Sequence, residues 1–117
     1  MEVVHLTDDK SVSDFLASRA VSRDLTILDF GATWCAPCRV QEKNLQAAIE
    51  VWPAEYVVAI IDVGVASATA VQYKVISLPT LIVLSAGVEL ARKVGTGGGV
   101  AGLQQFVASL ASDKVLN

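Results

Sequence analysis

The chain has 117 residues, with nine lysines and arginines against twelve aspartates and glutamates, so its formal net charge at pH 7 is −3. This length predicts one domain over residues 1–117, large enough to bury a hydrophobic core. The acidic balance and the scattered basic residues argue against a nucleic-acid-binding protein, and two cysteines are too few for a disulfide-rich secreted scaffold.

The first ten residues lack the basic start and the long apolar run of a secretory signal peptide. The apolar stretch 56–71 is short for a membrane span and contains Asp62 and Gly64. We therefore expect a soluble protein of the reducing cytoplasm, with no nucleic-acid or membrane partner.

The first half of the chain predicts two strands and two helices. An apolar run at 2–6 indicates an edge strand, and Thr7 or Asp8 can cap a helix that ends near Ala20. Residues 25–32 form a nearly continuous apolar run, typical of a central strand that is covered on both faces. This strand contains one acid, Asp29.

The second predicted helix runs from Cys35 to about Trp52 and ends before Pro53. Its apolar residues suggest that one face is buried and the other faces solvent. The predicted buried stripe is Val40, Leu45, Ala48, Ile49 and Trp52, and the predicted outward residues are Glu42, Lys43, Gln46 and Glu50.

The second half predicts a strand at 56–63, a weak helix at 66–73 and a bend at 77–80. A hairpin follows, with strands 80–84 and 88–94 joined by a tight turn. After the glycine-rich segment 95–99, a final helix is expected at 100–110, with Leu103, Phe106, Val107 and Leu110 inside. The order predicts an α/β protein with a mixed sheet covered on both faces.

The two cysteines lie within the motif Trp34-Cys35-Ala36-Pro37-Cys38, directly after the central strand. If Cys35 caps the helix, Cys38 lies one turn further on the same face, and the two sulfurs can approach disulfide distance. Pro37 suits the start of a helix. The unpaired N–H groups and the helix dipole would stabilise a thiolate at Cys35 and lower its pKa.

This spacing therefore predicts a redox pair. Two alternatives remain open from the residues alone: a structural pair of reduced thiols, or half of a zinc site shared between two chains. The single histidine, His5, is far away in the sequence, and we expect it to have no chemical role.

Over nearly its whole length the chain resembles the thioredoxin family. The matching segments occur in family order and with near-family spacing: Asp29-Phe30, Trp34 to Arg39, Tyr73-Lys74-Val75, Leu78-Pro79-Thr80 and Lys93-Val94-Gly95. The resemblance implies a thioredoxin fold, with a central mixed sheet of about five strands flanked by about four helices.

The resemblance also implies roles for individual residues. Cys35 is similar to the attacking cysteine, Cys38 to the resolving cysteine and Asp29 to the buried acid that exchanges a proton with it. Pro79 resembles the cis-proline beside the disulfide. The residues similar to the apolar rim that receives a partner polypeptide are Trp34, Ala36, Pro37, Leu78, Val94, Gly95 and Thr96; the backbone of Leu78 would pair with an extended substrate strand.

By this resemblance the chain is expected to be a monomeric enzyme that reduces protein disulfides by dithiol–disulfide exchange. Its substrates would be disulfide-containing proteins, and its electron donor an enzyme of the thioredoxin-reductase type. No metal or organic cofactor is implied beyond the Cys35–Cys38 disulfide. The alternatives are a binding or chaperone-type module, or a specialised oxidant or single-partner reductant with a shifted redox potential.

The sequence departs from the family pattern at several positions. Ala36 replaces a glycine that is usual between the cysteines, Gly31 replaces a frequent second tryptophan, and Lys43 replaces a frequent proline. No charged residue occurs at 58–61, where the family often has one near the buried acid. Asp29 is therefore expected to be isolated, with its pKa raised by burial.

Overall fold

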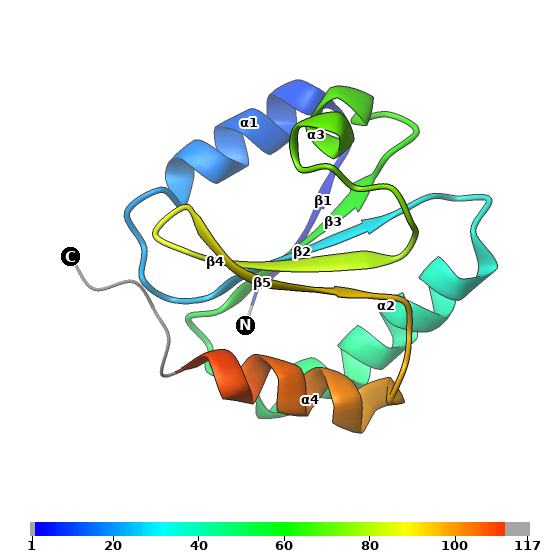
Figure 1. The fold of residues 1–117 in the computed structure, drawn as a ribbon. Coiled ribbons are helices and arrows are strands. Elements are labelled where there is room, and N and C mark those ends of the chain that lie inside the picture. The colour runs from blue at the N-terminus through cyan, green and yellow to red at the C-terminus, as the bar shows by residue number, and fades with distance from the viewer. Residues whose placement is uncertain (1, 112–117) are drawn as a thin grey trace.

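The computed structural model describes residues 2–111, which form a five-stranded sheet flanked by helices (Figure 1). The predicted element order is confirmed. The elements are β1 (Glu2–Leu6), α1 (Asp9–Ser18), β2 (Thr26–Gly31), α2 (Ala36–Ala48), β3 (Val57–Asp62), α3 (Ser67–Gln72), β4 (Thr80–Ser85), β5 (Val88–Val94) and α4 (Gly99–Leu110), with a short 3-10 turn at Ile49–Val51.

The strands lie in the order β1-β3-β2-β4-β5. β3 runs parallel to both β1 and β2, whereas β4 is antiparallel to β2 and β5. In Figure 1, α1 and α3 lie on one side of the sheet, and α2 and α4 lie on the other. The predicted mixed sheet, covered on both faces, is thereby confirmed.

Side chains of the central strand β2 alternate between two hydrophobic cores. Ile27 packs in the core with residues of α2 and α4, whereas Leu28 and Phe30 pack in the core with α1. Successive side chains of a strand point to opposite faces. Asp29 therefore shares the face of Ile27, on the same side of the sheet as α2.

The predicted start of α1 is confirmed, because Asp8 is its N-cap and accepts a hydrogen bond from Ser11 N at 2.7 Å. The helix ends at Ser18, slightly before the predicted Ala20. Asp9, the first residue of α1, contacts α3. Its carboxylate accepts hydrogen bonds from Thr69 N and Thr69 Oγ1, both at 2.8 Å. Asp9 thus supplies a cap that the short helix α3 lacks in its own sequence.

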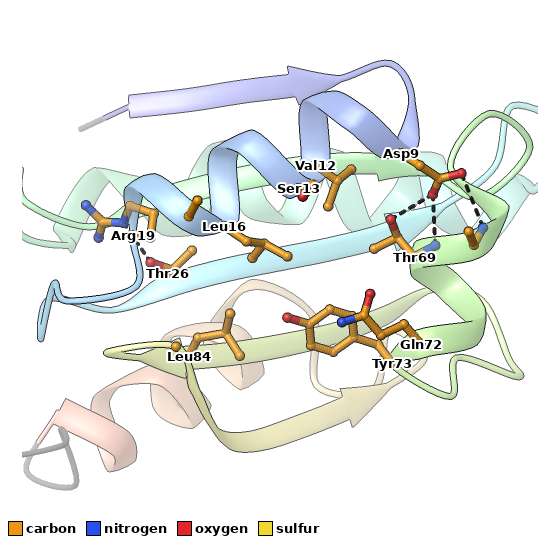
Figure 2. A pocket seen from close by; sticks show the side chains of 13 residues that line it. Asp9, Val12, Ser13, Leu16, Arg19, Thr26, Thr69, Gln72, Tyr73 and Leu84 are labelled. Carbon is orange, nitrogen blue, oxygen red and sulfur yellow. Dashed lines mark hydrogen bonds between the residues drawn. The ribbon is translucent and has the colours of Figure 1, made fainter.

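A cavity of about 510 Å³ lies between α1 and α3 (Figure 2). Its two charged side chains are both engaged within the protein: Asp9 binds the start of α3, and Arg19 Nε donates to Thr26 Oγ1 at 2.8 Å. The first contact joins α1 to α3, and the second joins the end of α1 to β2. Both lie on the face of the sheet opposite Asp29.

The phase of α2 differs from the prediction. Val40 is 50% exposed, whereas Gln41 is fully buried beside Cys38, Leu45 and Ala48 on the inner face. Glu42 is half-buried rather than turned to solvent. Cys38 and Leu45 fix the inner face, and Gln41 lies three residues after the first and four before the second. Position 40 therefore falls outside that face.

The buried amide of Gln41 predicts a stabilising substitution. Among the described residues, neither its Nε2 nor its Oε1 has a hydrogen-bond partner. A buried unpaired polar group costs about 1–3 kcal/mol. Gln41→Leu keeps a similar volume, so we expect the free energy of unfolding of the oxidised protein to rise by about 1–3 kcal/mol in urea denaturation.

The matched control is Gln46→Leu, because Gln46 is exposed on the same helix. Surface substitutions usually change stability by less than about 0.5 kcal/mol. If Gln41→Leu leaves the protein no more stable than Gln46→Leu does, the amide of Gln41 has no stability cost.

Candidate active site

Cys35 is the N-cap of α2, as the sequence predicts. Its backbone is extended, with φ −103° and ψ 107°, and its Sγ accepts a hydrogen bond from Cys38 N at 3.2 Å. Pro37 lies in the first turn of the helix. The sulfur of Cys35 thus occupies the position at which a helix start stabilises an anion.

The two cysteines form a disulfide, with their Cα atoms 5.3 Å apart. Both cysteines are buried. They pack with Ala32 in a small cluster that Val63 and Leu78 contact. The backbone of Gly31 lies directly against this cluster, because a Cβ placed there would be 3.1 Å from Cys38 Cβ and 3.2 Å from Cys38 Sγ. The disulfide is therefore held between the start of α2 and the end of β2.

The Leu78–Pro79 peptide bond is cis, as predicted, and Pro79 is buried. The carbonyl oxygen of Pro79 accepts a hydrogen bond from Gly95 N at 2.8 Å, and Thr80 pairs with Val94 across the β4–β5 ladder. The structure thus brings the Leu78-Pro79 bend next to the Val94-Gly95 segment, although the two are far apart in sequence.

The predicted rim residues range from exposed to half-buried. Trp34 is 74% exposed and Val94 is 58% exposed, while Ala36 and Pro37 are also exposed. Leu78, Gly95 and Thr96 are half-buried. An apolar side chain that the sequence reasoning missed is Ile76, which is 96% exposed two residues before Leu78. The signal in the sequence that could have identified Ile76 as a rim candidate is its position directly before the Ser-Leu-Pro bend.

Asp29 is only 3% exposed, and its Oδ1 has no hydrogen-bond partner among the described residues. Burial, with a smaller contribution from the charge of Glu42, raises the pKa of Asp29 to about 7. The predicted direction is confirmed. A carboxyl group with such a pKa can both accept and donate a proton near neutral pH.

Asp29 and Cys38 line the same cavity, which has a volume of about 520 Å³. Most of its wall is apolar and comes from β1, β3 and the segment after β2. Its other titratable or charged residues are His5, Arg39, Glu42 and Asp62. Sequence reasoning placed Glu42 on the solvent face of α2 and so missed it.

Comparison with known proteins identifies the family. The family model described as Thioredoxin matches residues 2–109. The chain belongs to the thioredoxin family. It is 35% identical over 109 residues to thioredoxin from Mycolicibacterium smegmatis, covering 92% of this chain and 94% of that relative.

Two further matches extend the comparison to a reductase fusion and to a solved structure. The chain is 31% identical over 103 residues to the bifunctional thioredoxin reductase/thioredoxin of Mycobacterium leprae, covering 88% of this chain and 22% of that protein. The crystal structure of a thioredoxin from Nicotiana alata superposes with a TM-score of 0.81 at 24% identity, covering 97% of this chain and 94% of that one. This match shows the thioredoxin fold.

Family membership and the bridged cysteine pair establish a thiol–disulfide oxidoreductase. Thioredoxins are protein disulfide oxidoreductases whose redox centre is this disulfide. Within residues 2–111, no three histidine, cysteine or acidic side chains are grouped so that they could hold a metal ion. None of the helices in this range has the length and hydropathy needed to cross a bilayer.

Proposed function

We propose that the chain reduces protein disulfides, with Cys35 as the attacking residue. The thiolate of Cys35 attacks one sulfur of a partner disulfide, and the partner's S–S bond breaks. The electron pair of that bond leaves on the partner's other sulfur as a thiolate, and a mixed disulfide between Cys35 and the partner forms. The position of Cys35 at the start of α2 supports this role, since Cys38 N donates to its sulfur.

Cys38 completes the exchange. Its thiol gives a proton to the carboxylate of Asp29, and the resulting thiolate attacks the sulfur of Cys35. The mixed disulfide breaks, the partner leaves with a second thiolate, and the Cys35–Cys38 disulfide forms. The cavity that Cys38 and Asp29 share, together with the raised pKa of Asp29, is the observation that supports this step.

The partner polypeptide binds in this proposal to the predicted rim around the disulfide. The side chains of Trp34 and Val94 offer apolar surface, and the backbone of Leu78, next to Pro79, would pair with an extended strand of the partner. Ala36, Pro37, Gly95 and Thr96 complete this rim. Ile76, two residues before Leu78, is a further exposed apolar side chain.

We propose a single-domain monomer that works in the cytoplasm and takes electrons from a reductase of the thioredoxin-reductase type. The fusion of both activities named in the Mycobacterium leprae relative supports this donor.

The proposal is tested by insulin disulfide reduction coupled to a generic thioredoxin reductase, with an equilibrium titration against glutathione. We expect catalytic reduction and a potential more reducing than that of glutathione. A protein that only oxidises in the titration would be a specialised oxidant.

Cys38→Ser is expected to trap the reaction half-way. The variant keeps the attacking thiol of Cys35 but lacks the resolving thiol, so mixed disulfides with insulin should accumulate and be visible as a mass shift on non-reducing electrophoresis. Addition of dithiothreitol should release them. If no adduct forms while Cys35 remains alkylatable, Cys38 is not the resolving residue.

A further inference from the structure

The cavity beside the disulfide contains a charge that the proposed exchange does not use. Glu42 lies on α2, four residues after Cys38, and lines this cavity together with Asp29 and Cys38. Residues four apart lie on the same side of a helix. Glu42 is half-buried, and among residues 2–111 it has no hydrogen bond or ion pair.

The surroundings of Glu42 and Asp29 favour an electrostatic interaction between their carboxyl groups. Ile60, which pairs with Asp29 across the β2–β3 ladder, and Val65 are among the apolar residues that line the cavity. Interactions between buried or partly buried charges are screened less by salt than those between fully exposed charges. A change in the charge of Glu42 will therefore change the pKa of the Asp29 carboxyl group.

Two of the other charged groups around the cavity, Arg39 and Asp62, are engaged in hydrogen bonds with backbone groups. Arg39 is exposed, and its NH1 group donates to Thr33 O at 3.0 Å. Asp62 Oδ1 accepts from Gly64 N at 2.7 Å, and His5 is exposed on β1. The strand positions opposite Asp29 are apolar, since Asp29 pairs with Ile60 on β3 and Leu81 on β4.

We propose that Glu42 is a positioning residue for the redox reaction: its negative charge, acting across the shared cavity, sets the pH range in which Asp29 takes the proton of Cys38 and releases it. This inference rests on the proposed role of Asp29 as the proton partner of Cys38. Glu42 contributes to the raised pKa of Asp29, next to the larger contribution of burial.

The consequence is that Asp29 can serve both directions of the exchange, formation and reduction of the Cys35–Cys38 disulfide. With its proton affinity matched to neutral pH, Asp29 can act as a base when Cys38 attacks Cys35 and as an acid when the disulfide is reduced again. Without the charge of Glu42, Asp29 would be ionised over a wider pH range and would return the proton less readily.

The test varies the charge at position 42 in two steps. Glu42→Gln removes one negative charge and Glu42→Lys changes the charge by two units. We expect the titration midpoint of the Asp29 carboxyl group, followed by carbon NMR in the oxidised protein, to fall by about 0.3–1 pH unit in Glu42→Gln. The fall in Glu42→Lys should be about twice as large.

The pH profile of single-turnover insulin reduction should shift in the same direction, while the far-UV spectrum stays unchanged. Glu50→Gln is the matched control, because Glu50 is an exposed acid that follows α2 and lies outside this cavity. We expect Glu50→Gln to change neither the titration midpoint of Asp29 nor the pH profile of insulin reduction. A structural role alone would change stability without a shift that scales with charge.

Asp29→Asn separates the two proposals. If Asp29→Asn leaves the pH profile as it is in the wild type, the proposed role of Asp29 is wrong. If Asp29→Asn changes the profile but both Glu42 variants behave like Glu50→Gln, the role of Asp29 stands and the inference about Glu42 is overturned.

Discussion

Cys35→Ser is expected to reduce insulin disulfide reduction to the uncatalysed background, a loss on the order of a thousandfold or more. The nucleophile in disulfide exchange is a thiolate, and a serine hydroxyl is not ionised at neutral pH and cannot form the mixed disulfide. Cys38 remains in this variant, but it lies inside α2 and not at the N-cap position, where a helix start stabilises a thiolate.

Serine is a suitable replacement because it keeps the local structure. Cys35 is an N-cap that accepts a bond from Cys38 N, and serine is among the preferred N-cap residues. The helix should therefore start at the same place, and loss of activity would report chemistry rather than unfolding. Circular dichroism of the variant checks this point.

The double variant Cys35→Ser, Cys38→Ser distinguishes the enzyme from a binding or chaperone-type module. If this variant retained full function, the apolar rim around Trp34 would act without thiol chemistry. Retained insulin reduction in Cys35→Ser alone would remove the assignment of Cys35 as the nucleophile.

Local signals in the sequence were sufficient for the redox pair and its setting. Cys35, Pro37 and Cys38 specify a helix start, because a cap, a proline in the first turn and a residue one turn later each have one favourable place there. Asp8 predicted the start of α1 for the same reason. The alternation of apolar strands and helices was sufficient for the layers of the fold.

The phase of α2 could not be obtained from hydrophobicity, because a polar residue occupies the inner face. Assigning buried positions by apolarity selected Val40, although the helix turns Gln41 inward. Counting from Cys38 instead, with steps of three and four residues, leads to Gln41 and Leu45. That count would also have placed Glu42 near the side of Cys38, whereas the cavity itself depends on side chains from β1, β2, β3 and α2 that only the folded chain brings together.

Asp29→Asn is expected to remove a large pH dependence of stability. The pKa of Asp29 is raised from 3.8 to about 7 in the folded protein. Between these values the folded state holds a proton that the unfolded state has lost, so the free energy of unfolding falls as the pH rises. A pKa difference of about 3 units corresponds to roughly 4 kcal/mol.

The sign of this effect follows from the protonated form. At a pH well below 3.8 the carboxyl group of Asp29 is neutral in both states, so its burial has no penalty for a charge. Above pH 7 the folded state must bury a carboxylate whose Oδ1 has no partner among the described residues. Asparagine does not titrate, so the variant lacks this loss.

Urea denaturation of the oxidised proteins from pH 4 to pH 8 measures the effect. We expect the difference in unfolding free energy, wild type minus Asp29→Asn, to decrease by roughly 4 kcal/mol over this range, mostly between pH 4 and pH 7. Taking the difference cancels the other titrating groups that the two proteins share.

Glu55→Gln serves as the control, because Glu55 is exposed and its carboxylate is solvated in the folded state. We expect its difference from the wild type to change little with pH. If Asp29→Asn shows an equally flat difference, Asp29 is solvated or paired in the folded protein. In that case burial does not hold its proton, and both its exchange with Cys38 and the influence of Glu42 would lose their physical basis.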